Sequence, residues 1–326
     1  MEPYPDSDTA FSHAIAVCLS DWSIEGKLFS VTINQPLSDS AVDNVRALLS
    51  VKNPLILHGQ LLVENCLART LSSIAVDALN FAHEAIKRVR DSVKYVKTSE
   101  SNEERFLELK QQLQVPTTKN LSLDDQTQWN TTFEMLIAAY ELKEVFSCLD
   151  TSDPDYKGGP SAEDWKQVET LYNYLKILFD TANLLSAPTI PTTHTFFHEA
   201  WKIQLELARA AVSEDPFVSG LTKSMQEKFD KYWKSSCLIL SIAVILDPRF
   251  KMKIVEFSFS KIYGDDASTY VRIVDEGIHE LFQDYVALST NELGLTDFDI
   301  METSIQQSRS GFLRISSLCS WAGSES

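Results

Sequence analysis

The stretch "KLFSVTINQP", residues 27–36, has the pattern of a short strand that ends abruptly. Its apolar residues are good strand formers, whereas Asn34 and Pro36 favour turns and end the strand. In open α/β sheets, binding and catalytic groups collect just past the carboxyl ends of strands. Asn34 stands at such a place, so its side chain bears directly on function.

Around this strand the sequence predicts the order helix, strand, helix, strand. Residues 9–22 carry an apolar stripe at helical spacing, and a second helix begins near Ser38 or Ser40. "LILHGQLLV", residues 55–63, is the second candidate strand. This order is typical of a parallel crossover unit. Two strands alone form an unstable sheet. Either further strands therefore lie upstream, or the unit packs against the helices that follow.

From about residue 65 to the 290s the apolar spacing predicts helices almost throughout. The turn-rich segment "TSDPDYKGGP", residues 151–160, is the best internal boundary, and Ser161 followed by Asp164 predicts a capping box. After about residue 290 the chain becomes polar and weakly patterned, which predicts a poorly ordered tail.

The composition is that of a soluble globular protein, with 44% hydrophobic and 23% charged residues among 326. No apolar run approaches the roughly 20 residues that span a bilayer, and the start lacks a signal-peptide pattern, so no membrane partner is expected. Five scattered cysteines, with no CxxC pair, favour a reducing compartment and argue against disulfides or zinc. We therefore expect no cofactor.

The net charge of −17 weighs against strong DNA binding, because phosphate-binding proteins usually carry a basic face. The segment "HEAIKRVRDSVKYVK", residues 83–97, is a local exception. Its pattern fits an amphipathic helix with a solvated basic face, or alternatively a helix that contacts phosphates. The candidate DNA-contacting residues are Lys87, Arg88, Arg90, Lys94 and Lys97.

Enzymatic motifs are scarce. There is no GxSxG motif, and no cysteine lies beside a plausible histidine partner. His194 and His198 are four residues apart and could share a metal, but no third ligand lies nearby, which favours a loop-and-cap role. The carboxylates are too scattered to predict a two-metal site, so no metal-binding residues are expected.

Several stretches, taken in order, resemble the hAT transposase family. Two stretches, "LDDQTQWNTTFEML" (123–136) and "KFDKYWKSSCLILSIAVILDPRFKMKIVEF" (228–257), are similar to segments of that family, and residues 164–201 resemble its helical insertion. The resemblance covers roughly residues 9–290. The amino-acid sequence of the first 120 residues is most similar to plant proteins of the Daysleeper type. These are host proteins derived from hAT transposases, and they carry a BED zinc finger and a dimerisation region.

This resemblance implies an RNase H-like fold interrupted by a large helical insertion. We therefore expect a mainly α protein with a small α/β part, in which residues 1–65 form a partial RNase H-like core. The expected parts are an α/β segment running into a long helix (1–98), the start of the insertion (99–150), the helical insertion domain (151–290) and the tail (291–326).

Active members of the family hold divalent metal with two aspartates and one glutamate. The strand that ends at Asn34 resembles the one that ends in the second aspartate, and an amide is a poorer ligand for a hard cation than a carboxylate. The first aspartate would lie upstream of Met1, and residues after 300, where the glutamate is expected, do not resemble the family. The other positions that match family motifs, some with altered residues, are Cys66, Arg69, Gln128, Trp129, Asp247 and Arg249.

The resemblance thus predicts a catalytically inactive, domesticated hAT-transposase-derived protein with a nuclear role in DNA binding and host gene regulation. DNA is the expected partner, bound weakly by this chain alone, and protein partners or full-length paralogues are further candidates. The alternatives are an acidic helical protein-interaction fragment that does not bind DNA, a non-functional truncated gene product, and a residual metal-dependent nuclease.

Overall fold

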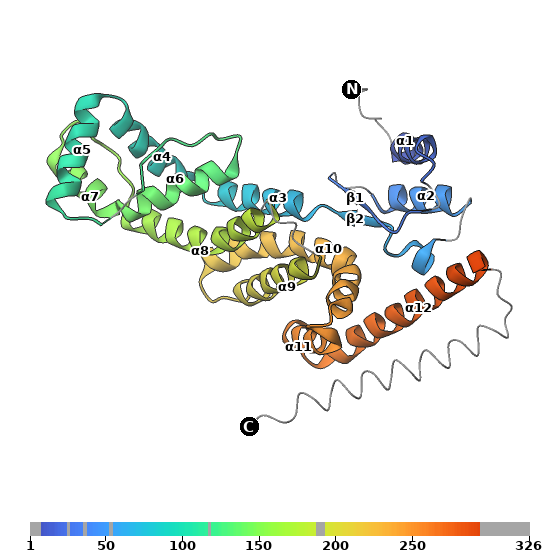
Figure 1. Ribbon diagram of the computed structural model, residues 1–326. Coiled ribbons are helices and arrows are strands. Elements are labelled where there is room, and N and C mark those ends of the chain that lie inside the picture. The colour runs from blue at the N-terminus through green and yellow to red at the C-terminus, as the bar shows by residue number, and fades with distance from the viewer. Residues whose placement is uncertain are drawn as a thin grey trace.

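The computed structural model describes residues 8–24, 27–34, 38–51, 55–116, 119–186 and 193–293. Within them, helices make up most of the structure, and one small two-stranded parallel sheet lies towards one end of the molecule (Figure 1). This architecture confirms the expected fold class, mainly α with a small α/β part. Most of the predicted tail, from residue 294 onward, lies outside the described residues.

The predicted crossover unit is present. Strand β1 pairs with β2 in parallel, with Val31 opposite Val63 and Ile33 opposite Asn65. Helix α2 connects them. Of the two predicted starts, Ser38 is the cap, and its Oγ accepts the Ala41 N–H at 3.1 Å. Helix α1 packs on α2. The bounds are α1 Asp8–Asp21, β1 Val31–Ile33, α2 Asp39–Ser50 and β2 Val63–Asn65.

The second strand lies later in the sequence than predicted. Residues Ile56–Gly59 of the expected strand at 55–63 instead form η1, a short 3-10 helix. Leu57 and His58 have positive φ angles of 49° and 50°, which are unfavourable for residues with side chains. Leu57 is nevertheless buried, and its N–H donates to the Asp284 carboxylate at 2.9 Å. This apolar run therefore encodes a buried turn rather than an extended strand.

The remaining chain is helical. Residues 65–98, whose spacing fits one long helix or two, form two helices, α3 and α4, which divide at Ala82. Residues Pro216–Leu246 form one continuous helix, α10. The bounds are α3 Leu67–Phe81, α4 His83–Lys97, α5 Glu100–Gln112, α6 Trp129–Glu141, α7 Lys143–Ser152, α8 Ala162–Leu185, α9 Thr193–Ala210, α10 Pro216–Leu246, α11 Lys251–Tyr263, η2 Gly264–Asp266 and α12 Ala267–Leu293.

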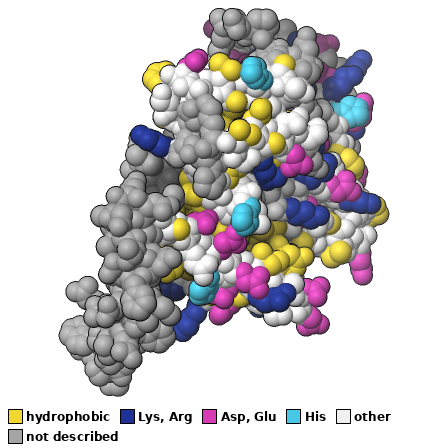
Figure 2. All heavy atoms as spheres, turned by 90° about the vertical axis from the view of Figure 1, so that its right-hand side faces the viewer, with side chains coloured by type: hydrophobic (Ala, Val, Ile, Leu, Met, Phe, Trp, Pro, Cys, Tyr) yellow, Lys and Arg dark blue, Asp and Glu magenta, His cyan; other side chains and the backbone are white. Residues whose placement is uncertain are grey.

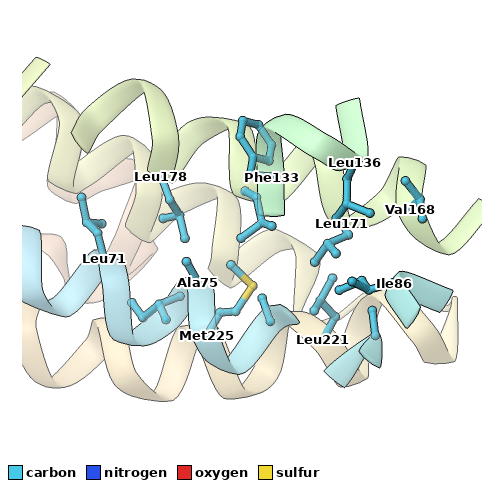
Figure 3. Close-up of a cluster of buried hydrophobic side chains, with 14 of the residues drawn as sticks. Leu71, Ala75, Ile86, Phe133, Leu136, Val168, Leu171, Leu178, Leu221 and Met225 are labelled. Carbon is cyan, nitrogen blue, oxygen red and sulfur yellow. The ribbon is translucent and has the colours of Figure 1, made fainter. Parts of the chain in front are cut away.

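A continuous apolar core joins the helices. Figure 3 shows side chains of α3, α6, α8 and α10 meeting, among them Leu71, Phe133, Leu171 and Met225, which are all at most 2% exposed. Helix α10 also packs on α9, α11, α12 and β2. It therefore links the helical core to the strand unit, which Figure 1 shows at the opposite end of the molecule from α5 and α7.

Candidate functional site

The carboxyl edge of the small sheet carries two amides. Asn34 follows β1 directly and is exposed, and Asn65 ends β2. The Asn65 Nδ2 donates to Ser235 Oγ of α10 at 3.3 Å. Within the described residues, no group of three or more His, Cys, Asp or Glu side chains could hold a metal ion.

The carboxylate of this strand pair is Glu64 on β2. Its side chain is buried against α10, and its Oε2 accepts a hydrogen bond from Ser236 Oγ at 2.6 Å. Burial raises its pKa from 4.5 to about 7, although the Ser236 hydrogen bond and the charge of Arg46 oppose the shift. Its Oε1 has no hydrogen-bond partner. Sequence analysis missed Glu64 because a single acid in a short strand carries no pattern.

The basic helix α4 has the predicted amphipathic form, but part of its charge is already paired. Arg88 donates from Nε and Nη2 to both carboxylate oxygens of Asp164, at 2.8 and 2.6 Å. Asp164 also completes the predicted capping box with Ser161 at the start of α8. Although burial alone would raise its pKa, the bonds from Arg88 and Ser161 lower it. Arg88 therefore ties α4 to the start of α8.

Arg90 makes a similar forked pair. Its Nε and Nη2 donate to Asp124 at 2.8 and 2.7 Å, and Thr132 Oγ1 donates to the same carboxylate at 2.6 Å. The Asp124 side chain is 1% exposed. Burial opposes ionisation, but these hydrogen bonds hold its pKa below the ordinary value. Arg90 thus anchors the segment before α6 to α4.

The other basic residues of α4 divide into two kinds. Lys97 is paired with Glu103 of α5. Lys87 and Lys94 are exposed, and neither has an ion pair among the residues that the structure describes. Of the five predicted DNA-contacting residues, these two keep their charge available for phosphate.

Two pairs of family-motif positions lie at helix starts. Cys66 precedes α3 without capping it through its side chain, and Arg69 is exposed on the first turn. Gln128 precedes α6, and its Nε2 donates to Asp125 at 2.9 Å. Trp129 packs edge-on against Phe179 with ring centroids 6.2 Å apart. These contacts support the local structure, and none of them assembles a catalytic group.

Asp247 and Arg249 form a cluster with His194 where α10 ends. The Arg249 Nε and Nη2 donate to Asp247 at 2.9 and 2.6 Å, and these bonds hold the pKa of the carboxyl well below its ordinary range. His194 Nδ1 lies 3.3 Å from the same carboxylate, and its Nε2 lies 3.0 Å from Arg249 Nη2. The cluster joins the start of α9 to the turn between α10 and α11.

Three family models match the chain. They are described as "ZBED1 RNase-like domain" over residues 1–61, "ZBED1 RNase-like helical domain" over residues 64–174, and "hAT-like transposase, RNase-H fold" over residues 194–285. The last range runs from the start of α9 into α12. No solved structure matches the chain.

Curated relatives agree with these models. The chain is 59% identical to "Zinc finger BED domain-containing protein DAYSLEEPER" of Arabidopsis thaliana, over 95% of this chain and 46% of that protein. It is 51% identical to "Zinc finger BED domain-containing protein RICESLEEPER 2" of Oryza sativa subsp. japonica, over 87% of this chain and 40% of that protein. It is 31% identical to "Putative AC transposase" of Zea mays, over 85% of this chain and 35% of that protein. The chain thus spans less than half the length of each of these relatives.

Proposed function

Since this chain belongs to the hAT-transposase-derived proteins of the Daysleeper type, we propose that it is a catalytically inactive part of a nuclear protein that acts on host gene expression through DNA. The DNA-binding and nuclear roles rest on the resemblance to BED zinc finger proteins. Within the described residues, no helix is both long enough and apolar enough to cross a membrane.

The residues at the sheet edge support the loss of catalysis. By the resemblance stated above, Asn34 stands where active members of the family carry an aspartate, and Asn65 ends the neighbouring strand. An amide offers one neutral oxygen, whereas a carboxylate offers two charged ones to a hard cation such as Mg²⁺. The Glu64 carboxylate is buried, and its Oε2 accepts a hydrogen bond from Ser236. This replacement of a carboxylate by an amide is the single observation on which the inactive assignment rests.

A DNA-cleavage assay tests this assignment. The purified chain should not nick supercoiled DNA with Mg²⁺ or Mn²⁺, and Asn34→Asp alone should not create activity, because one carboxylate cannot assemble a two-metal site. Metal-dependent nicking that is lost on Asn34→Ala would refute it. Asn34 is exposed, so both variants are expected to keep the fold.

The expected DNA binding is weak. Lys87 and Lys94 are the exposed, unpaired cations of α4, so we expect about two phosphate contacts from this helix. Each contact contributes a slope of about −0.9 in a plot of log affinity against log salt, so affinity should fall about 12-fold between roughly 50 and 200 mM salt.

A gel shift at about 150 mM salt, near physiological ionic strength, decides between weak and specific binding. We expect at most weak, sequence-independent binding that is lost near this salt concentration. Lys87→Glu combined with Lys94→Glu should abolish any binding that is seen. Lys97→Gln serves as a matched control on the same helix, because Lys97 is already paired with Glu103. Tight binding to one sequence over scrambled competitor would overturn this part of the proposal.

A second candidate function is protein interaction without DNA contact. The pairing of Arg88, Arg90 and Lys97 with carboxylates favours it, because it leaves little of the basic face for phosphate. The net charge of −17 also repels nucleic acid. Repeating the gel shift at about 50 mM salt, a condition that favours phosphate contacts, separates the two functions, because this candidate predicts no binding even there.

A further inference from the structure

A polar hollow of about 540 Å³ lies beside strand β2, between α2 and α10. This volume is within the range of small-molecule sites. Figure 2 looks onto the end of the molecule that carries α1 and α2, where basic and acidic side chains are intermixed. The residues that carry the argument are Asp43, Arg46, Gln60, Asn65, Lys234 and Ser235.

Two cations face this hollow from different helices. Arg46 of α2 is held in place by its Nε, which donates to the Gly59 carbonyl at 2.9 Å. Its Nη1 donates to Asp43 at 3.1 Å, and its Nη2 has no hydrogen-bond acceptor among the residues that the structure describes. Lys234 of α10 is exposed, and its amine has no ion-pair or hydrogen-bond partner among the same residues. The Arg46 guanidinium is therefore already oriented by its hydrogen bonds, and the Lys234 amine is available to bind a ligand.

Neutral hydrogen-bonding groups line the same hollow as the two cations. Gln60 and Asn65 bring amides, and Ser235 brings a hydroxyl. One N–H of the Asn65 amide donates to Ser235 Oγ, and the second N–H is available to donate to a ligand. A guanidinium, an ammonium and amide donors around one space are the groups that recognise an anion with several oxygens.

The local charge also favours an anion. Arg46 and Lys234 give two positive charges and Asp43 gives one negative, so the lining is net positive in a chain of net charge −17. The neighbouring Glu64 adds less than a full negative charge near neutral pH, because burial raises its pKa to about 7. The hollow is thus a locally positive region on an acidic molecule.

We propose that this hollow binds a phosphate group, with Arg46 and Lys234 holding its oxygens from opposite sides and Asn65 donating a further hydrogen bond. The volume exceeds that of a single phosphate, so the group can be carried on a nucleoside. The two sources of this chemistry are a free nucleotide and the phosphodiester backbone of a nucleic acid. The site is separate from the basic face of α4 and does not depend on it.

The test measures dissociation constants at constant ionic strength for three probes: inorganic phosphate, adenosine monophosphate and a labelled duplex of about 20 base pairs. Lys234→Gln should weaken binding about tenfold, which is the loss of one charge-assisted hydrogen bond. Asp43→Asn should strengthen binding severalfold, because it removes the one negative charge of the lining. Lys231→Gln, on the same exposed helix segment but outside the hollow, should change nothing.

The outcomes are distinct. Binding of phosphate and adenosine monophosphate that responds to these variants, without duplex binding, assigns the site to a free nucleotide. Duplex binding that Lys234→Gln weakens, and that Lys87→Glu with Lys94→Glu leaves intact, assigns it to a nucleic-acid backbone. Absence of binding to all three probes overturns the proposal. Equal effects of Lys234→Gln and Lys231→Gln also overturn it, because a general charge effect would then explain the binding.

Discussion

Replacement of Glu64 by glutamine should change how the stability of the protein depends on pH. The Glu64 side chain is buried, with 6% of the residue exposed, between β2 and α10. Burial raises its pKa from 4.5 to about 7 in the folded protein, because a charged carboxylate loses its hydration there. The folded state therefore favours the protonated carboxyl, and glutamine keeps its shape without the charge.

The size of the effect follows from the two pKa values. The difference between 4.5 and about 7 corresponds to about 3 kcal/mol of unfolding free energy, at about 1.4 kcal/mol for each pKa unit. A group whose pKa is raised by folding contributes its full stability below the unfolded pKa. That stability is lost as the pH rises through the folded pKa. For Glu64, the loss runs from about pH 4.5 to about pH 7.

Urea unfolding followed by circular dichroism between about pH 4 and pH 8 measures this difference. Glu64→Gln should resemble the wild type at the acidic end and be more stable by about 3 kcal/mol at the alkaline end. The control is Glu108→Gln, an exposed acid on α5, which should show no pH-dependent difference. A difference between Glu64→Gln and wild type that stays constant across this range would refute the reasoning.

Three further predictions concern the contacts that hold the fold. Arg90→Met should lower the unfolding free energy by about 3 kcal/mol in urea titration, because it leaves the buried Asp124 carboxylate without its charged partner. Gly59→Ala should cost about 1–2 kcal/mol in the same assay, since φ is +76° and the new Cβ would stand 2.9 Å from a leucine side chain. Asp284→Ala should speed hydrogen exchange at the Leu57 amide by about tenfold, because that buried N–H loses its acceptor.

The local elements of this fold could be predicted where short-range patterns specify them. Ser38 and Ser161 cap the helices that they were expected to cap, because a capping side chain bonds to amides three residues away. The helical spacing of α4 likewise identified its buried and basic faces. These features depend on neighbours in sequence and require no knowledge of the rest of the chain.

The features that sequence reasoning missed depend on distant partners. The apolar run around Leu57 was interpreted as a strand because nothing local shows that its N–H meets Asp284, 227 residues later. The charges of Arg88 and Arg90 were interpreted as available because their partners Asp164 and Asp124 lie 76 and 34 residues away. A basic helix and an ion-paired helix have the same sequence pattern, and only the tertiary structure separates them.

The distance along the chain between the strand unit and its supports has a consequence for protein synthesis. Asn65 meets Ser235, and Leu57 meets Asp284, across separations of 170 and 227 residues. At roughly 5–20 residues per second, the ribosome needs about 10 to 45 s to make the later partner after the earlier one. Until then the paired strands lack the helices that bury Glu64 and Leu57. The strand unit is therefore made well before the helices that support it, and it is among the last parts of this chain to reach its final environment. During that interval its apolar side chains are open to chaperones.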